Sequence, residues 1–307
     1  MSAMTLDSNN KLPLAVIGSS SMVGSRFCDL SNQNFRLIKA DLHGEIPVDI
    51  TDVKSVRHFF LQNNFQYLIL FSAFADVDEA EKQRGNKEGN CWKINVEGVR
   101  NVANACKKFK RKLIFISTDF VFDGINGPYD ETDPIGGDLD KISWYGLSKI
   151  EGEKIVQRVL ADFIILRISY PYRAEFQKKD DFAKIILRRY QENNLFPMFS
   201  DQFYSPTFID DLAPATRLII SRDQRGIFHI ASPQITTPYD FAKHLILAFG
   251  GNPSKVRNGS ILQTKLGAPR SANGGLKVEK IRNLGFLPTD WKRGIQIIYS
   301  QSKGKLI

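Results

Sequence analysis

Short apolar runs that alternate with helical patterns along the first half of the chain constrain the fold more than any other feature. The runs have the length and composition of strands buried on both faces of a parallel sheet: LPLAVI (12–17), FRLIKA (35–40), YLILFSA (67–73), KLIFIS (112–117) and FIILRI (163–168). Between the third and fourth runs, apolar residues at spacings of four and three mark one face of a helix: Trp92, Val96, Val99, Ala103 and Cys106. This alternation predicts an α/β fold with a doubly wound parallel sheet.

The pattern loosens after about residue 169, where long loops are expected over 196–207 and 250–275. We therefore predict two parts of unequal regularity. A domain of the Rossmann type covers 12–168, with a return segment near 205–232. A smaller, less regular C-terminal lobe, which would bind the substrate, covers 169–204 and 233–300.

The composition is that of a globular protein, with 42% hydrophobic and 24% charged residues. No apolar run approaches the roughly 18 residues of a membrane span. The start, MSAMTLDSNNK, has neither the basic nor the apolar region of a secretory signal. We therefore predict a cytoplasmic protein without a membrane partner.

The cysteines and histidines do not have the spacing of a metal site or of a disulfide framework. Cys28, Cys91 and Cys106 are odd in number and fall in helical patterns, so buried reduced thiols are expected. The histidines are scattered without ligand spacing, and no metal site is predicted: His43, His58, His229 and His244.

The net charge of +9 raises the question of a nucleic-acid partner. The densest basic cluster lies at the end of one predicted helix: Lys107, Lys108, Lys110, Arg111 and Lys112. Cations at this end complement the helix dipole, and the interleaved aromatic residues of a nucleic-acid platform are absent. We interpret the cluster as a solvated face and predict no nucleic-acid partner. The basic balance also suits an anionic nucleotide substrate.

The segment Gly18-Ser-Ser-Ser-Met-Val-Gly24 directly follows the first predicted strand. A pyrophosphate needs a tight turn without an obstructing side chain, followed by backbone N–H groups at a helix N-terminus. Ser21 stands where a GxxGxxG pattern would have its middle glycine, so a serine-rich turn without a ligand is the alternative. The predicted dinucleotide contacts are Gly18, Ser20, Ser21, Met22, Val23 and Gly24.

Asp41 ends the second predicted strand, 23 residues after Gly18, where a carboxylate would bind a ribose 2′-hydroxyl. A carboxylate there repels the extra phosphate of NADP, and no arginine follows closely. The predicted cofactor is therefore NAD(P)H, with NAD favoured; a surface-turn aspartate is the alternative. Asp49 and Ile50 could line the adenine, and Asp52 is also suited to cap the next helix.

Tyr145 and Lys149 are four residues apart, which places both on one face of a helix. The same spacing occurs in two other pairs, which we interpret as helix-surface residues: Tyr239 with Lys243 and Tyr299 with Lys303. Tyr145 differs because its helix follows Thr118, at the C-terminal end of the fourth strand, where open α/β sheets bind ligands.

Carbonyl reduction by hydride explains these residue types. The alkoxide formed needs a proton, and a phenol of pKa ~10 is too weak an acid-base group unless its anion is stabilised. A shift of about three pKa units takes roughly 4 kcal/mol, which Lys149 and an oxidised nicotinamide could supply. Thr118 would donate a hydrogen bond to the substrate oxygen. The predicted catalytic residues are thus Thr118, Tyr145 and Lys149.

Several blocks resemble the dTDP-4-dehydrorhamnose reductase family, within the extended short-chain dehydrogenases/reductases. In the first half these are Phe74-Ala-Asp-Val-Asp-Glu-Ala-Glu81, Ile94-Asn-Val-Glu-Gly98, Ile116-Ser-Thr-Asp-Phe-Val-Phe-Asp-Gly124, Pro128-Tyr-Asp-Glu131 and Tyr145-Gly-Leu-Ser-Lys-Ile-Glu-Gly-Glu153. In the second half, Arg167-Ile-Ser-Tyr170 resembles RTSW, Asp201-Gln-Phe-Tyr-Ser-Pro-Thr207 resembles DQxGxPT, Arg270-Ser-Ala-Asn-Gly-Gly-Leu276 resembles RPxNSxL, and Asp290-Trp-Lys-Arg-Gly294 resembles DWxxG.

The chain departs from the family pattern mainly in the substrate lobe. Tyr204 replaces the glycine of DQxGxPT, Ser271 the proline of RPxNSxL, and Gly274 its serine. The run from Gly136 to Trp144 is also longer than usual. The pattern therefore predicts reduction more firmly than it predicts the sugar.

The resemblance implies an NAD(P)H-dependent reductase of a nucleotide-linked 4-keto-6-deoxy sugar, with hydride transferred to C4 and Tyr145 as proton donor. It also implies cofactor contacts at Ser72, Ala73, Phe74, Asn95 and Tyr170, besides Tyr145 and Lys149. Asn95 is expected to cap or pack at the sheet edge rather than to transfer protons. Substrate contacts are expected at Asp119 and Arg270, the latter as a bidentate donor to a diphosphate or, alternatively, in a surface salt bridge.

Two other functions are compatible with the sequence. One is a nucleotide-sugar epimerase or dehydratase, although Asp119 and Phe120 do not supply the extra acid-base pair that such enzymes usually need. The other is a non-catalytic NAD(P)-binding subunit, because the family resembles the regulatory subunit of methionine adenosyltransferase. The oligomeric state, including a homodimer, is left open.

Overall fold

The computed structural model describes residues 11–305, which form two compact units. The first unit contains the described residues up to Thr118, together with Ser143–Arg167 and Leu212–Phe228. The second contains Asp119–Ile142, Ile168–Asp211 and the described residues from His229 onward. Compared with the predicted domain ranges, residues 119–142 fall in the second unit, and the segment that returns to the first is shorter.

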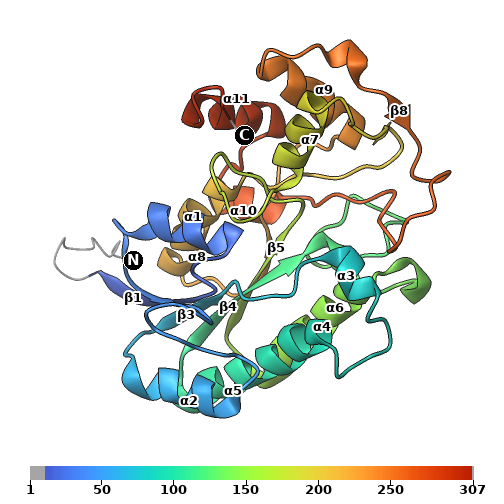
Figure 1. Ribbon diagram of the computed structural model, residues 1–307. Helices are drawn as coiled ribbons and strands as arrows, with labels where there is room; N and C mark the ends of the chain where they lie inside the picture. The colour runs from blue at the N-terminus through green and yellow to red at the C-terminus, as the bar shows by residue number, and fades with distance from the viewer. Residues whose placement is uncertain (1–10, 306–307) are drawn as a thin grey trace. The chain divides into compact units, whose positions relative to one another are not determined.

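The first unit is built on a sheet whose strand order is β2-β1-β3-β4-β5-β7 (Figure 1). Its strands are β1 (Leu12–Ile17), β2 (Phe35–Ala40), β3 (Tyr67–Leu70), β4 (Lys112–Thr118), β5 (Phe163–Ile168) and β7 (Gly226–His229). Pairing is parallel between β1 and β2, β1 and β3, and β3 and β4. The five apolar runs all become strands, although β3 ends before the last three residues of its run. The predicted doubly wound α/β fold is confirmed.

Helices cover both faces of this sheet. On one face, α1 (Met22–Ser31) packs against α8 (Leu212–Ser221) (Figure 1). On the other lie α2 (Val53–Gln62), α5 (Val99–Phe109) and α6 (Trp144–Val159). Between β3 and α5 the chain forms α3 (Val77–Glu81), α4 (Asn90–Trp92) and a π-helical segment, Lys93–Gly98.

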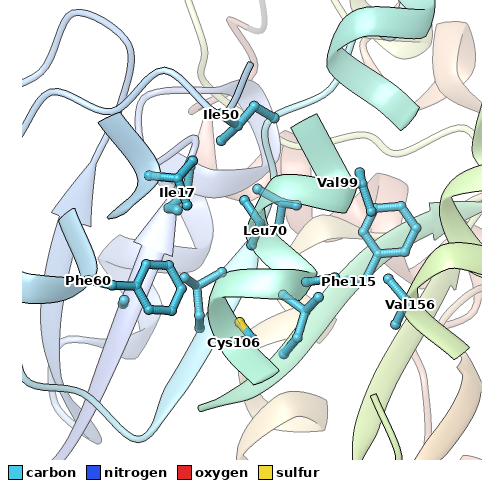
Figure 2. Packing of buried hydrophobic residues seen from close by; sticks show 14 of the residues in the cluster. Ile17, Ile50, Phe60, Leu70, Val99, Cys106, Phe115 and Val156 are labelled. Carbon is cyan, nitrogen blue, oxygen red and sulfur yellow. The ribbon is translucent and has the colours of Figure 1, made fainter. Parts of the chain in front are cut away.

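A buried apolar cluster holds the sheet to α2, α5 and α6 (Figure 2). Its residues come from strands, helices and loops, and include Ile17, Ile50, Phe60, Leu70, Val99, Cys106, Phe115 and Val156. Each such aliphatic or aromatic side chain contributes roughly 1.5–3 kcal/mol when it leaves water. The cluster therefore fixes the ends of β3 and β4 relative to α6. The three cysteines are buried free thiols, as predicted.

The second unit has little sheet. It contains β6 (Met198–Phe199), β8 (Asn258–Gly259), α7 (Phe182–Gln191), α9 (Pro238–Ala248), α10 (Glu279–Asn283) and α11 (Trp291–Gln301). Short 3-10 turns lie at Asp119–Val121, Leu139–Lys141, Ile209–Asp211 and Pro253–Lys255. Helix α9 contacts both α7 and α11. Their shared core is rich in aromatic side chains, among them Tyr172, Tyr204, Phe241 and Trp291.

Two extended segments of the second unit pair with each other although they are far apart in the sequence. Asn273 N–H donates to the Gly124 carbonyl oxygen at 2.9 Å, and Lys277 N–H donates to the Tyr129 carbonyl oxygen at 2.7 Å. Two of the family-like blocks, around Gly124 and around Asn273, thus form one ladder. Within residues 11–305, no helix is long and apolar enough to cross a membrane.

Candidate functional site

The loop after β1 approaches the loop after β3 closely enough to require glycine. Because β1 lies between β2 and β3 in the sheet, the chain leaves its C-terminal end at a topological switch point. Gly18 has φ +85°, and a Cβ there would lie 2.5 Å from the Ser72 backbone nitrogen. A Cβ on Gly24 would lie 2.2 Å from the Gly18 carbonyl oxygen. Both glycines of the predicted loop are therefore needed for this tight turn into α1.

Ser21 explains the missing middle glycine. Its Oγ donates to the Gly18 carbonyl oxygen at 2.7 Å and accepts from Gly24 N–H at 3.1 Å. It is also the residue that caps the N-terminus of α1. The hydroxyl of Ser21 thus closes the turn from inside, which a glycine could not do.

Asp41 lies at the rim of this loop, immediately after β2. One carboxylate oxygen accepts from both the N–H and the Oγ of Ser20, each at 2.8 Å. The other accepts from Leu42 N–H at 2.8 Å. A carboxylate is therefore held beside the Gly18 loop by hydrogen bonds from Ser20 and Leu42.

The residues predicted to line the adenine form contacts of their own within the first unit. Asp49 accepts from Thr51 N–H at 2.8 Å and from Thr51 Oγ1 at 2.7 Å. The side chain of Ile50 is 5% exposed and belongs to the core. Asp52 caps α2 through Lys54 N–H, as predicted.

Asn95 joins the end of β3 to α6. It lies in the π-helical segment and is 1% exposed. Its Oδ1 accepts from Phe74 N–H at 2.9 Å, while its Nδ2 donates to the Phe74 carbonyl oxygen at 3.0 Å and to Ser148 Oγ at 2.9 Å. Ser148 in turn donates to the Tyr145 carbonyl oxygen at 2.7 Å. Asn95 therefore packs between the loop after β3 and α6, and Ser72, Ala73 and Phe74 form a partly buried strip beside it.

The three predicted catalytic residues lie at the C-terminal end of β4 and in the first turns of α6. Thr118 is the last residue of β4 and is 6% exposed. Tyr145 is the second residue of α6, and Lys149 follows one turn later on the same face. Lys149 Nζ donates to the Ile116 carbonyl oxygen at 2.7 Å, two residues before Thr118. The structure thus brings the two predicted blocks together.

Lys149 is a deeply buried cation. It is 2% exposed, and its Nζ lies 4.1 Å from the ring centroid of Phe115. Burial lowers the pKa of Lys149 to about 7, although Glu153 and Cys91 act in the opposite direction. A buried ammonium that lacks full solvation gains from any anion formed beside it, and a phenolate is such an anion.

A buried ion pair anchors the same face of α6 one turn further along the helix. Arg167 Nε and Nη2 donate to the two carboxylate oxygens of Glu153 at 2.9 and 2.7 Å. The side chains are 2% and 0% exposed. The pair joins α6 to β5. Sequence reasoning assigned no role to either residue, because nothing in their spacing marks them as partners.

The remaining predicted residues belong to the second unit, where they surround Phe120. Asp119 Oδ2 accepts from Ser169 Oγ at 2.6 Å. Tyr170, which has φ +40°, lies 5.9 Å from the Phe120 ring, and its hydroxyl accepts from Gln202 Nε2 at 3.2 Å. The Arg270 guanidinium lies 5.9 Å from the same ring, within cation–π range. Asp119, Tyr170 and Arg270 are thus grouped by their contacts. Among residues 11–305, no group of three or more His, Cys, Asp or Glu is placed to hold a metal ion.

The departures from the family pattern are packing residues of the second unit. Tyr204 is 2% exposed and its ring lies 4.8 Å from that of Tyr170. A Cβ on Gly124 would lie 2.0 Å from Ser271 Oγ, and one on Gly274 would lie 2.8 Å from the same oxygen. Ser271 is therefore enclosed by two glycines, so the changes at positions 271 and 274 are coupled through packing.

Comparison with known proteins identifies the family. Residues 12–303 match the family described as the RmlD substrate binding domain. The dTDP-4-dehydrorhamnose reductase of Mycolicibacterium smegmatis is 28% identical, over 92% of this chain and 84% of that protein. The reductase of the same name from Sinorhizobium fredii is 32% identical, over 73% of this chain and 76% of that protein.

A solved structure gives the same result. The crystal structure of dTDP-4-dehydrorhamnose reductase from Bacillus anthracis in complex with NADP has a TM-score of 0.84 and 26% identity, covering 95% of this chain and all of that one. The predicted resemblance and enzyme class are therefore confirmed. The chain belongs to the RmlD substrate binding domain family, that of the dTDP-4-dehydrorhamnose reductases, and is an oxidoreductase of this type.

Proposed function

We propose that this protein reduces the 4-keto group of a nucleotide-linked 4-keto-6-deoxy sugar with NAD(P)H, that hydride is transferred to C4, and that Tyr145 donates the proton. The observation that carries the proposal is the buried Lys149 ammonium, bonded to Ile116 beside Thr118 and one turn from Tyr145 on α6. The names of the relatives support the substrate class, because each is a dTDP-4-dehydrorhamnose reductase.

The first unit has features that fit a nicotinamide dinucleotide. The turn at Gly18 and Gly24 leaves no room for a Cβ and leads into the N-terminus of α1, where a diphosphate is favoured. Asp41 and Ser20 at its rim would hold a ribose, and the strip from Ser72 to Phe74 would line the cofactor further along. When bound, the reduced nicotinamide supplies the hydride.

The protein side chains then handle the oxygen of the substrate. Thr118 donates a hydrogen bond to the carbonyl oxygen, which gains negative charge as C4 accepts the hydride. Tyr145 gives its phenolic proton to that oxygen, so that the ketone becomes a CH–OH group. Lys149 stabilises the remaining phenolate through its positive charge. The ketone is thus reduced by one hydride and one proton, and NADH or NADPH is oxidised to NAD⁺ or NADP⁺.

The substrate contacts proposed in the second unit are Asp119 and Arg270, and Tyr170 is proposed as a cofactor contact. Arg270 is suited to the diphosphate, because its planar guanidinium offers two parallel N–H donors to phosphate oxygens. The hydrogen bond between Asp119 and Ser169 gives Asp119 a positioning role and disfavours the dehydratase alternative. An epimerase or dehydratase would need a second acid-base group next to Thr118, and Phe120 cannot supply one.

We also propose a preference for NADH over NADPH, based on Asp41. Replacing Asp41 with Asn keeps the shape and removes the charge, so the ratio of kcat/KM for NADPH to that for NADH should rise roughly tenfold, equivalent to about 1.4 kcal/mol. Steady-state kinetics with both cofactors measures this ratio. An unchanged ratio would remove Asp41 as the basis of the preference.

The decisive assay uses the purified full chain with NADH or NADPH and a panel of nucleotide-linked 4-keto sugars. Nicotinamide absorbance should fall only when both cofactor and a keto sugar are present. If the protein binds the cofactor but the nicotinamide absorbance does not fall with any sugar of the panel, the result would support a non-catalytic subunit instead. The changes at Tyr204, Ser271 and Gly274 in the second unit are accounted for by packing and do not by themselves support that alternative.

A further inference from the structure

The first turn of α6 is held by a side chain from another part of the chain. Trp144, the first residue of α6, donates its backbone N–H to Glu81 Oε2 at 2.8 Å. The first amides of a helix have no acceptor within the helix. Ser143 caps Gly146 N–H at 3.1 Å, so Glu81 serves a different amide of the same turn. Tyr145 is the next residue after Trp144.

Glu81 is itself held in a fixed orientation. It ends α3, and its Oε1 forms an ion pair with Arg84 Nε at 2.5 Å, while Arg84 Nη2 lies 3.3 Å from Oε2. The Glu81 side chain is 15% exposed. A carboxylate near a helix N-terminus also interacts favourably with the helix dipole. The acceptor for Trp144 is therefore oriented before any ligand arrives.

The Trp144 side chain completes the restraint. Its ring stacks on Trp92 with centroids 5.0 Å apart and an interplanar angle of 25°. It is 6% exposed, and within residues 11–305 its Nε1 has no hydrogen-bond partner. No hydrogen bond from the indole therefore orients this residue. Its position depends on the stacking with Trp92 and on the backbone bond to Glu81.

We propose that Glu81 is a positioning residue for Tyr145: through the Trp144 amide it fixes the first turn of α6 and thereby the place of the phenol. This inference rests on the proposed function, in which Tyr145 is the proton donor. A role in positioning predicts a loss in kcat rather than in KM, because Glu81 contacts Trp144 and Arg84 and is assigned no contact with cofactor or substrate.

The kinetic test compares Glu81→Ala and Glu81→Gln with a matched control in the same helix, Glu79→Ala. Glu79 forms an exposed ion pair with Lys82 and should leave kcat unchanged. Since small misplacements of reacting groups cost up to about a hundredfold, Glu81→Ala should lower kcat roughly tenfold or more, with KM within about twofold. Glu81→Gln should restore kcat to within about threefold of wild type, because its amide oxygen still accepts the Trp144 N–H.

Hydrogen exchange at the Trp144 amide tests the bond independently of activity. Exchange should be faster in Glu81→Ala and unchanged in Glu79→Ala. If Glu81→Ala does not fold, Arg84→Ala is the alternative variant, because it loosens the Glu81 carboxylate without removing it. It should give a smaller loss of kcat, again with KM nearly unchanged.

Two results would overturn the inference: wild-type kcat in Glu81→Ala, or a loss that Glu81→Gln does not relieve. If the wild-type protein reduces no sugar of the panel, the proposed function fails. The exchange rates then decide alone whether Glu81 fixes the first turn.

Discussion

In the first unit the buried ion pair joins two different elements, whereas in the second it stays within one turn of one helix. Glu153 on α6 meets Arg167 on β5, while Lys184 of α7 meets Asp181, the residue that caps that helix, at 2.6 Å. The first arrangement fixes the position of α6 relative to the sheet. The second ties the start of α7 to the backbone of Arg173, whose N–H donates to Asp181 Oδ2 at 3.2 Å and whose carbonyl oxygen accepts from Lys184 Nζ at 3.0 Å. Buried charge in the first unit therefore restrains the very helix that carries Tyr145 and Lys149.

The cores differ in the same way. Around α6, several buried polar groups form a connected hydrogen-bond network, as in the chain from Phe74 through Asn95 and Ser148 to Tyr145. Around Tyr204 the contacts are between aromatic rings, and the Tyr204 hydroxyl has no hydrogen-bond partner within residues 11–305. Packing by shape tolerates exchange better than paired buried polar groups do. This is why the departures from the family gather in the second unit.

The largest expected effect on this comparison comes from Arg167→Ala. The change leaves the Glu153 carboxylate buried without its cation, which typically costs about 3–5 kcal/mol of unfolding free energy. Urea denaturation measures this. The matched control is Arg225→Ala, because Arg225 is 58% exposed in its ion pairs with Asp162 and Asp223 and should cost less than about 1 kcal/mol. Equal losses in the two variants would mean that the buried pair does not anchor α6.

A second effect, which depends on pH, is expected from Lys149. Its pKa is lowered by burial from 10.5 to about 7, so between these values the unfolded chain binds a proton that the folded chain does not. Because of this group alone, the unfolding free energy should therefore rise with pH in this window by roughly 1.4 kcal/mol per pH unit. Below about pH 7 both the folded and the unfolded chain bind the proton, so this pH dependence should disappear. Lys149→Met removes the titrating group, so this variant should not show the rise. If the unfolding free energies of wild type and variant, measured by denaturation, change in parallel from pH 7 to pH 10, the lowered pKa is contradicted.

The smallest expected effect is that of Tyr204→Phe. Removing a buried hydroxyl without a partner should leave the unfolding free energy unchanged or raise it by up to about 1 kcal/mol. Tyr172→Phe serves as the comparison, since the Tyr172 hydroxyl donates to the Trp291 carbonyl oxygen at 3.4 Å and its loss should not stabilise. Thermal unfolding of both variants ranks them. A clear destabilisation by Tyr204→Phe would show that this hydroxyl has a partner or a function.

The strands and the glycine loop could be predicted because their causes are local. A run such as FIILRI is buried on both faces wherever it lies in the sheet, and Gly18 is required by the turn it makes. The positions of Thr118 at a strand end and of Tyr145 and Lys149 on one helix face could be predicted because a strand end and a helical spacing each carry a local pattern. What the sequence did not reveal were partners that meet only after folding, such as Glu81 with Trp144 and Glu153 with Arg167.

The departures at Tyr204 and Ser271 show the same limit of sequence patterns. Their positions in the family pattern left the identity of the sugar open, and the structure places Tyr204 in an aromatic core and Ser271 against Gly124. A sequence pattern gives the position of a change, while its consequence depends on neighbours from distant segments.

The central claim is that Tyr145, held by α6 beside Lys149, donates the proton in carbonyl reduction. It is tested most directly by kcat for NAD(P)H-dependent sugar reduction in Tyr145→Phe, with Tyr239→Phe as control, because Tyr239 has the same spacing to a lysine, Lys243, on helix α9. Loss of a general acid lowers kcat by about 10²- to 10⁴-fold, and we expect a loss in this range for Tyr145→Phe and none for Tyr239→Phe. A Tyr145→Phe protein that reduces the sugar at the wild-type rate would contradict the account.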